Sequence, residues 1–404
     1  MSQYEPASGS CIPRRKKKPS KEKTQNLEEE VVVEIDHDCL THILQKIHNL
    51  SDFIRFRSVC SSWRSLAKQH RPLLLEGVPC FLHPGGDYFH QRTSGFFMPL
   101  SKLKNNTTQL QEQPQLSLPG CSWSYHGCAY GWVLYQENPR QHCDITVLNP
   151  VTGQKLYLPC PVGYGKIFFS SCPSNPNFFI LAASYYTGRL HRCRPGDESW
   201  VDIITPKSQY LFRNLTFYNG QVYVLGYDLK RQTDEVLVYH LNNSATTAIV
   251  NLPRQPEAYA KQIEVLYLVE VRGEQLLLVY RMRRKNTETG LYNKTESFEI
   301  YRLLCFGNGS RSWEVVESLG EYAIFLGDKC TQPFVLSELK VPSIRGNRIY
   351  FMPEHRGLRS SPDSGVYDLL ERAVVESFDN DDHLSRNTPS AVWFVPAPFS
   401  TFKS

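Results

Sequence analysis

The sequence predicts a mainly β protein in which a small all-α module of three helices precedes a β-propeller of about six blades. Apolar residues at helical spacing are confined to a short stretch from Ile35 to about His70. After about Cys80, apolar runs of strand length alternate with turns that contain Gly or Asn. These strand–turn–strand units first recur about every 45 residues, which is typical of propeller blades. The predicted organisation is a disordered basic tail (1–33), a helical module (34–72) and a propeller (80–398).

The composition excludes several classes of protein. A hydrophobic content of 41%, with 12% aromatic residues, is enough for a sizeable core. The net charge of +5 is small for 404 residues and does not indicate a membrane surface, and it makes a nucleic-acid partner unlikely. No apolar run approaches the roughly 20 residues of a membrane span. The twelve scattered cysteines form no CxxC pair, so we expect reduced thiols.

The first 33 residues are polar and carry a cationic cluster between Arg14 and Lys18. Self-repelling charge without core-forming residues predicts disorder. The tail lacks an apolar secretory core, so we expect an intracellular protein, in the nucleus, the cytoplasm or both. A nuclear import receptor could recognise the cluster, and a solvated tail without a receptor is the alternative.

The first helix of the module is predicted from one apolar stripe. Leu40, Ile43, Leu44 and Ile47 stand at i, i+3, i+4 and i+7. Acidic residues occupy its first turn, where the helix dipole favours negative charge. Asn49 and the residues after it interrupt the pattern.

Two further helices follow. Ser51 can cap the second helix, and a serine at 61 or 62 begins the third. Their apolar residues are Phe53, Ile54, Phe56 and Val59 in the second helix, and Trp63, Leu66 and Ala67 in the third. Three short helices over about 40 residues bury too little surface to be very stable alone. Some of these apolar side chains should therefore be available to a partner.

The propeller is predicted from repeated hairpins. They lie at residues 145–158, 190–201, 236–250, 298–315 and 365–375. Each follows an apolar strand, at 132–135, 178–181, 222–225, 276–279 and 348–351. A sixth blade would form if the C-terminal strand 392–395 paired with the segment 80–99 and closed the ring; seven blades are the alternative. Radial repetition protects strand edges better than an open sheet of this size.

The sequence offers no catalytic constellation, no cofactor motif and no metal site. The segment Gly163 to Lys166 lacks the first glycine and the Ser or Thr of a phosphate-binding loop. The acidic run Asp379 to Asp382 with His383 is followed by no glycine and glutamate at calcium-loop spacing. Asp328 is explained as a turn residue. We predict a non-catalytic protein, and a propeller enzyme with a helical appendage stays an alternative that no residue set supports.

The helical stretch resembles the F-box. The more specific half is the series Asp52-Phe53-Ile54, Arg57, Val59-Cys60, Trp63-Arg64 and Leu66-Ala67. F-boxes usually open with Leu-Pro, and this chain has Ile35-Asp36, which keeps the apolar anchor and loses the proline. That departure could weaken adaptor binding. A helix-turn-helix DNA binder is disfavoured because the third helix lacks a row of base-reading side chains.

The remainder resembles plant F-box proteins whose C-terminal half is a propeller long described as a domain of unknown function. The matching motifs include Tyr125 to Leu134, Leu148 to Gly153, Cys193 to Trp200, Tyr322 to Cys330, Gly346 to Phe351 and Ala391 to Pro396. The resemblance implies the substrate-recognition subunit of a Skp–cullin–F-box E3 ubiquitin ligase. It would bind a Skp-type adaptor, and through it the cullin and RING subunits, and would hold an unknown target protein on the propeller. The alternative is a ligase-independent interaction or regulatory protein, which could act in the nucleus.

Two sets of binding residues follow. The adaptor-binding set is Ile35, Leu40, Ile43, Leu44, Ile47, Phe53, Ile54, Val59, Cys60 and Trp63. A helical cap packed on the propeller would explain the same residues without a partner. The target-binding set is the cationic insertion Arg281, Arg283, Arg284 and Lys285, which could hold an acidic or phosphorylated segment. A solvated hairpin tip is the alternative.

Overall fold

The computed structural model describes nineteen segments of the chain. They are residues 35–47, 50–69, 80–83, 95–99, 115–116, 123–137, 144–150, 153–160, 166–184, 188–204, 210–240, 243–254, 262–271, 273–285, 292–327, 332–335, 344–352, 363–378 and 392–394. The predicted basic tail, the acidic run from Asp379 and the turn residue Asp328 lie outside these residues.

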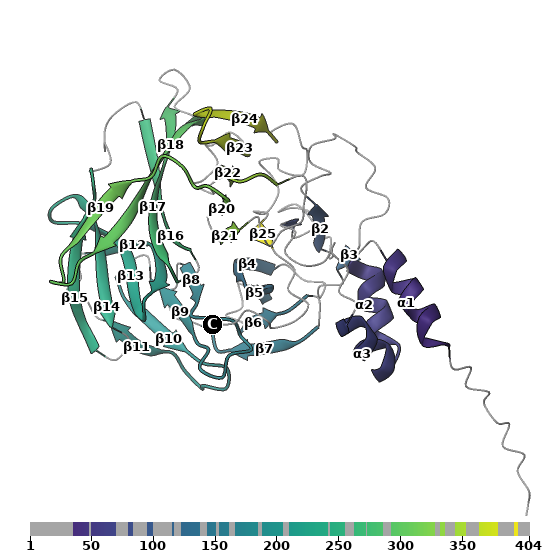
Figure 1. The fold of residues 1–404 in the computed structure, drawn as a ribbon. Helices are drawn as coiled ribbons and strands as arrows, with labels where there is room; N and C mark the ends of the chain where they lie inside the picture. The colour runs from purple at the N-terminus through teal and green to yellow at the C-terminus, as the bar shows by residue number, and fades with distance from the viewer. Residues whose placement is uncertain are drawn as a thin grey trace, which may run out of the picture.

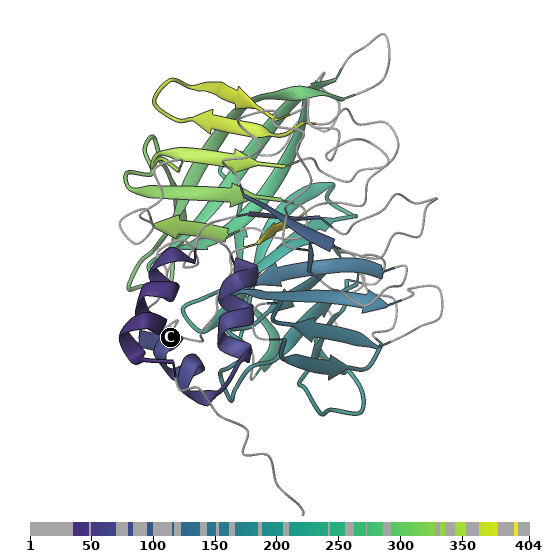
Figure 2. The same ribbon diagram turned by 90° about the vertical axis from the view of Figure 1, so that its right-hand side faces the viewer.

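The N-terminal module consists of three short helices, α1 (His37–Lys46), α2 (Leu50–Ser58) and α3 (Ser61–Gln69). They share one small apolar core, made of Leu40, Leu44, Phe53, Phe56, Leu66 and Ala67. The rings of Phe56 and Trp63 lie 4.5 Å apart between α2 and α3. Figures 1 and 2 show the three helices gathered beside the ring of sheets. Within the described residues, no helix has the length and apolar character needed to cross a membrane.

The described strands form six sheets arranged around a ring, so the predicted mainly β propeller is confirmed (Figure 1). Four sheets each contain four consecutive strands. They are β4 (Trp123–Ala129), β5 (Trp132–Glu137), β6 (Ile145–Leu148) and β7 (Lys155–Leu158); β8 (Lys166–Phe169), β9 (Ile180–Ala183), β10 (Leu190–Cys193) and β11 (Val201–Ile204); β12 (Tyr210–Tyr218), β13 (Gln221–Asp228), β14 (Thr233–His240) and β15 (Asn243–Asn251); and β16 (Gln262–Val271), β17 (Gln275–Lys285), β18 (Tyr292–Cys305) and β19 (Arg311–Val315).

The fifth sheet has an additional strand. It contains β20 (Tyr322–Leu326), β21 (Gln332–Val335), β22 (Arg348–Phe351), β23 (Gly365–Asp368) and β24 (Ala373–Ser377), in the order β21-β20-β22-β23-β24. β20 and β22 pair in parallel, with Ala323 opposite Arg348. β21 is the innermost strand because the chain turns back after β20 before it enters β22. The sequence pattern did not predict this insertion.

The sixth sheet joins the two ends of the propeller. It contains β1 (Cys80–His83), β2 (Gly95–Pro99), β3 (Gln115–Leu116) and β25 (Val392–Phe394). β25 pairs antiparallel with β1, with Phe81 opposite Trp393, so the predicted pairing of the C-terminal strand is confirmed. The Trp393 side chain is buried, and its indole N–H donates to the Leu326 carbonyl at 3.0 Å. A strand of three residues therefore closes the ring.

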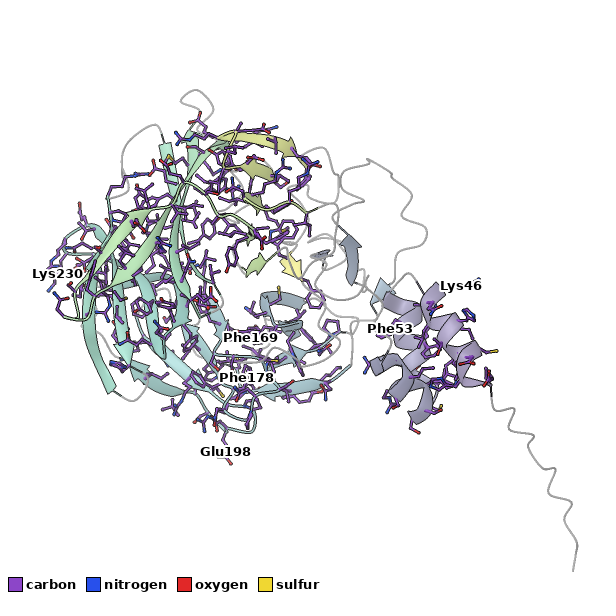
Figure 3. All side chains as sticks on the ribbon, viewed as in Figure 1. Lys46, Phe53, Phe169, Phe178, Glu198 and Lys230 are labelled. Atoms are coloured by element: carbon purple, nitrogen blue, oxygen red, sulfur yellow. The ribbon has the colours of Figure 1, made fainter. Side chains whose placement is uncertain are left out.

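The propeller core lies between neighbouring sheets. Each of four buried clusters of described residues combines side chains of two adjacent sheets. Phe169 and Phe178, labelled in Figure 3, belong to one such cluster, with ring centroids 6.0 Å apart. Indole N–H groups add links between outer strands, from Trp200 to the Pro159 carbonyl and from Trp313 to the Asn251 carbonyl, each at 2.8 Å. Alternating apolar residues in each strand give every sheet two faces to bury.

Candidate functional site

Among the described side chains of the helical module, three large aliphatic ones are exposed to solvent. With the whole chain present, Ile35 is 45% exposed, Ile43 is 42% exposed and Val59 is 59% exposed. Ile35 precedes α1, Ile43 lies within α1, and Val59 follows α2. These exposed fractions hold with the propeller in place, so no sheet covers these three side chains. We call Ile35, Ile43 and Val59 the exposed aliphatic set.

Three residues of the predicted adaptor-binding set hold the module together instead. Leu40, Leu44 and Phe53 are buried in the shared core of the helices. Figure 3 shows Phe53 inside the module and Lys46 at its edge. The prediction that these three form a docking surface is wrong, because a buried side chain cannot contact a partner without unfolding the module.

The other predicted residues fall between these two groups. Ile47 and Trp63 are partly buried and pack against the same core. Cys60 is exposed between α2 and α3, and the side chain of Ile54 lies outside the described residues. The i, i+3, i+4, i+7 stripe of α1 is therefore split: Leu40 and Leu44 face inward, and Ile43 faces solvent.

The first turn of α1 forms without the proline that is usual in F-boxes. Asp36 has φ −56° and ψ 142°, and its carbonyl accepts a hydrogen bond from the Leu40 N–H at 3.0 Å. Proline fixes φ near −65°, so Asp36 already has a backbone conformation that proline allows. The helix therefore begins at this position without a proline.

Cationic and thiol groups lie beside the exposed aliphatic set. The guanidinium of Arg57 lies over the Phe53 ring at 5.8 Å, and burial, followed by the nearby Arg64, lowers its pKa. A hydrogen bond with the Ser62 hydroxyl, followed by the backbone N–H of Trp63, lowers the pKa of the Cys60 thiol. Val59 thus has a cationic and a thiol neighbour, whereas Ile35 is followed by Asp36 and Asp38, so charges of both signs border the set.

The predicted target-binding arginines lie in the interior of the propeller. Arg281 is 0% exposed and donates to the Met352 carbonyl (2.7 Å), the Thr295 hydroxyl (2.8 Å) and the Asp363 carboxylate (2.8 Å). Arg283 is also buried, and its Nε lies 2.9 Å from the same carboxylate. The prediction of a surface site is wrong for both arginines. The side chains of Arg284 and Lys285 lie outside the described residues.

Asp363 and Thr295 complete this network, and sequence reasoning missed both. The Thr295 N–H and hydroxyl donate to the two Asp363 oxygens at 2.9 and 2.7 Å. We call Arg281, Arg283, Thr295 and Asp363 the arginine clasp. It joins β17 and β18 to Asp363, two residues before β23, and so ties two neighbouring sheets. Asp363 stands 82 residues from Arg281 in the chain, so no local signal could have paired them.

Among the described residues, no group of three or more His, Cys, Asp or Glu side chains is placed to hold a metal ion. Of the segment 163–166, weighed above as a phosphate loop, the structure describes Lys166, which begins β8. The predicted site residues therefore fall into an exposed apolar set on the helices and an enclosed ionic clasp in the propeller.

Comparison with known proteins agrees with this architecture. Residues 97–368 match the KIB1-4 beta-propeller family, and residues 34–75 match the F-box domain. The first match covers more than half of the chain. The chain belongs to the KIB1-4 β-propeller family. The resemblance to plant F-box proteins with a C-terminal propeller is thereby confirmed.

Relatives of this KIB1-4 propeller chain include F-box proteins of Arabidopsis thaliana. F-box protein SKIP23 is 22% identical over 397 residues, covering 82% of this chain and 88% of the relative. The putative F-box/kelch-repeat protein At5g24040 is 25% identical over 367 residues, covering 84% and 92%. Each alignment covers more than four fifths of this chain.

Proposed function

We propose that this chain is the substrate-recognition subunit of a Skp–cullin–F-box E3 ubiquitin ligase. The F-box would bind a Skp-type adaptor, and the adaptor would link it to the cullin and RING subunits. The propeller would hold a target protein and lead to its ubiquitination. The observation that supports this proposal is the exposed aliphatic set on an F-box whose own core is already complete.

A receptor of this kind needs no nucleophile. Its contribution is to raise the effective concentration of a target lysine near a charged conjugating enzyme. This role is compatible with the architecture, in which a small adaptor module and a large ring of sheets belong to one chain. We place the protein inside the cell, in the nucleus or the cytoplasm, because that ligase operates there.

The exposed aliphatic set allows an estimate of its contribution to the free energy of adaptor binding. Full burial of one aliphatic side chain contributes roughly 1.5–3 kcal/mol. Since each member is about half exposed, docking would add about half of that for each, or roughly 2–4 kcal/mol for the three. Their loss should weaken adaptor binding by about 30- to 1000-fold.

The test is calorimetric titration of the full chain with a purified Skp-type adaptor. The variant Ile35→Ser/Ile43→Ser/Val59→Ser should show the stated loss of affinity and keep the helical circular dichroism of the parent. Leu370→Ser is the matched control, because Leu370 is an 84% exposed aliphatic residue of the propeller. Equal affinity of the triple variant and the control would refute adaptor docking through this set.

A ligase-independent interaction protein is the second candidate, and the absence of the usual proline at Asp36 favours it. Reconstitution separates the two. A ligase subunit should carry cullin and RING subunits with it when all purified components are mixed. An interaction protein should bind the adaptor weakly or not at all, and should recruit no cullin.

A further inference from the structure

The innermost strands of the six sheets surround the axis of the ring. β25, β4, β8, β12, β16 and β21 contact one another in that order, and Figure 1 shows them around its middle. In a ring of repeated blades these strands run in the same direction, so their last residues meet at one end of the axis. The side chains at these strand ends therefore determine which ligands that end of the axis can bind.

Five of the six sheets place a titratable side chain there. Tyr130 follows β4, Cys172 follows β8, Tyr218 ends β12, and Glu270 is the penultimate residue of β16. Tyr322 begins β20, opposite the last residue of β21, and so lies at the same end. We call these five residues and Glu274, in the β16–β17 turn, the axial cluster.

Hydrogen bonds tie members of the axial cluster together across sheets. The Tyr218 hydroxyl donates to the Glu274 carbonyl at 3.1 Å, and the Tyr322 hydroxyl donates to the Glu274 carboxylate at 3.5 Å. Glu274 is exposed, Glu270 and Tyr322 are partly exposed, and Tyr218 is buried, so solvent reaches the cluster through the first three. Three sheets therefore present carboxylate and phenol oxygens at one accessible place.

Side chains from opposite sides of the ring stand at this end of the axis. Burial raises the pKa of Tyr130 to about 12, with smaller contributions from the charges of Glu270 and Cys172. Tyr130 lies in the turn between β4 and β5. Glu270 lies in β16, whose sheet is on the opposite side of the ring. The strand ends thus bring a tyrosine and a carboxylate from opposite sheets to the same end of the axis.

Glu270 lacks a positive partner within the described part of the chain. There it accepts a hydrogen bond from the Gly273 N–H and pairs with no cationic side chain. Burial raises its pKa, because a carboxylate withdrawn from water without a counter-charge loses solvation. A bound cation would relieve this cost, and the surrounding phenols offer both oxygen acceptors and ring faces to it.

We propose that the axial cluster is the site at which the propeller binds a lysine or arginine side chain of its target protein. This rests on the proposed function, because it names the chemistry of the target segment. The carboxylate of Glu270 neutralises the cation, and the hydroxyls of Tyr130, Tyr218 and Tyr322 accept its remaining hydrogen bonds.

The test uses the full chain without any adaptor and ligand-observed NMR. The probes are blocked Gly/Ser peptides that carry one central lysine, arginine or norleucine, and spermidine as a free amine. The lysine and arginine peptides should bind and the norleucine peptide should not. Glu270→Gln keeps the acceptor for Gly273 and should weaken binding roughly tenfold or more, the usual effect of losing a hydrogen-bonded charge.

Glu314→Gln is the matched control, since Glu314 is an exposed carboxylate of the outer strand β19. It should bind like the parent. Tyr322→Phe removes one hydroxyl and should weaken binding severalfold. Equal binding of the norleucine peptide, unchanged affinity of Glu270→Gln, or binding of spermidine alone would each overturn the proposal. Adaptor binding measured on the same samples shows whether the proposed function fails separately.

Discussion

The arginine clasp gives the sharpest prediction, because Asp363→Asn removes the charge that neutralises two buried guanidinium groups. The side chains of Arg281 and Asp363 are 0% and 3% exposed, and Arg283 is 3% exposed. Arginine stays protonated in proteins, so both charges would remain buried. Asparagine keeps one oxygen for the Thr295 N–H, which isolates the effect of charge from the loss of that hydrogen bond.

The expected cost follows from burial. Breaking a buried ion pair by removing one partner costs roughly 3–5 kcal/mol. At about 2 °C for each kcal/mol, the lower end of the range for large domains, the midpoint of thermal unfolding should fall by about 6–10 °C. Differential scanning calorimetry of the full chain measures this, and urea unfolding followed by tryptophan fluorescence provides a second reading.

An exposed ion pair serves as the control. Arg302 and Glu314 pair on the outer strands with side chains 40% and 47% exposed, and such pairs contribute about 0–1 kcal/mol. Arg302→Met should therefore leave the midpoint within about 2 °C of the parent. If Asp363→Asn shifted the midpoint no more than this control, the clasp would not stabilise the propeller.

Three further predictions concern the ends of the fold and its acid stability. Trp393→Ala should cost roughly 3–5 kcal/mol of stability and open the ring. Proteolysis between the sheets should become faster, while the helices keep their circular dichroism. Unchanged proteolysis would contradict closure by β25. Asp36→Pro should stabilise the F-box by about 0.4–1 kcal/mol in urea unfolding, and a loss of helix would show that its backbone cannot accept proline. Burial raises the pKa of Asp368, but hydrogen bonds from two N–H groups of the next turn and the Arg348 guanidinium outweigh it and lower the pKa. The stability it contributes is therefore present above the pKa of the unfolded chain and lost as pH falls below about 4. Asp368→Asn should flatten that acid loss in pH-dependent melting curves, and equally steep loss in the variant would refute the assignment.

The sequence predicted the strands well because the alternation of apolar residues is a local property. It predicted the docking residues less well, because a helical stripe does not say which of its members a third helix will cover. Leu44 and Ile43 are neighbours in one stripe, and only packing against α2 and α3 separates them. A module of this size has to use some of its apolar residues for itself before any are left for a partner.

The arginines illustrate a different limit. Arg281 and Arg283 continue the alternation of Leu277 and Val279, so their side chains point to the face that packs on the next sheet. This periodicity can be read from the sequence. It indicated that the two arginines are buried, and it was a stronger signal than their positive charge, which indicated exposure. The partner that makes burial tolerable, Asp363, belongs to a different sheet and could not be predicted from local pattern.

The position of the F-box in the chain links the two proposed binding events. Residues 70–79 connect α3 to β1, and β1 pairs with β25, which Trp393 anchors to β20 and β4 through Leu326 and Cys128. Along the chain, the helices are thus followed directly by the sheet that closes the ring. A ligase receptor has to hold its target at a fixed distance from the conjugating enzyme, so the sheet that holds the adaptor module should be the one least free to move. The buried Trp393 limits this movement although β25 has only three residues. The sheets on both sides of β25 hold the strand, and these sheets are themselves packed in the ring.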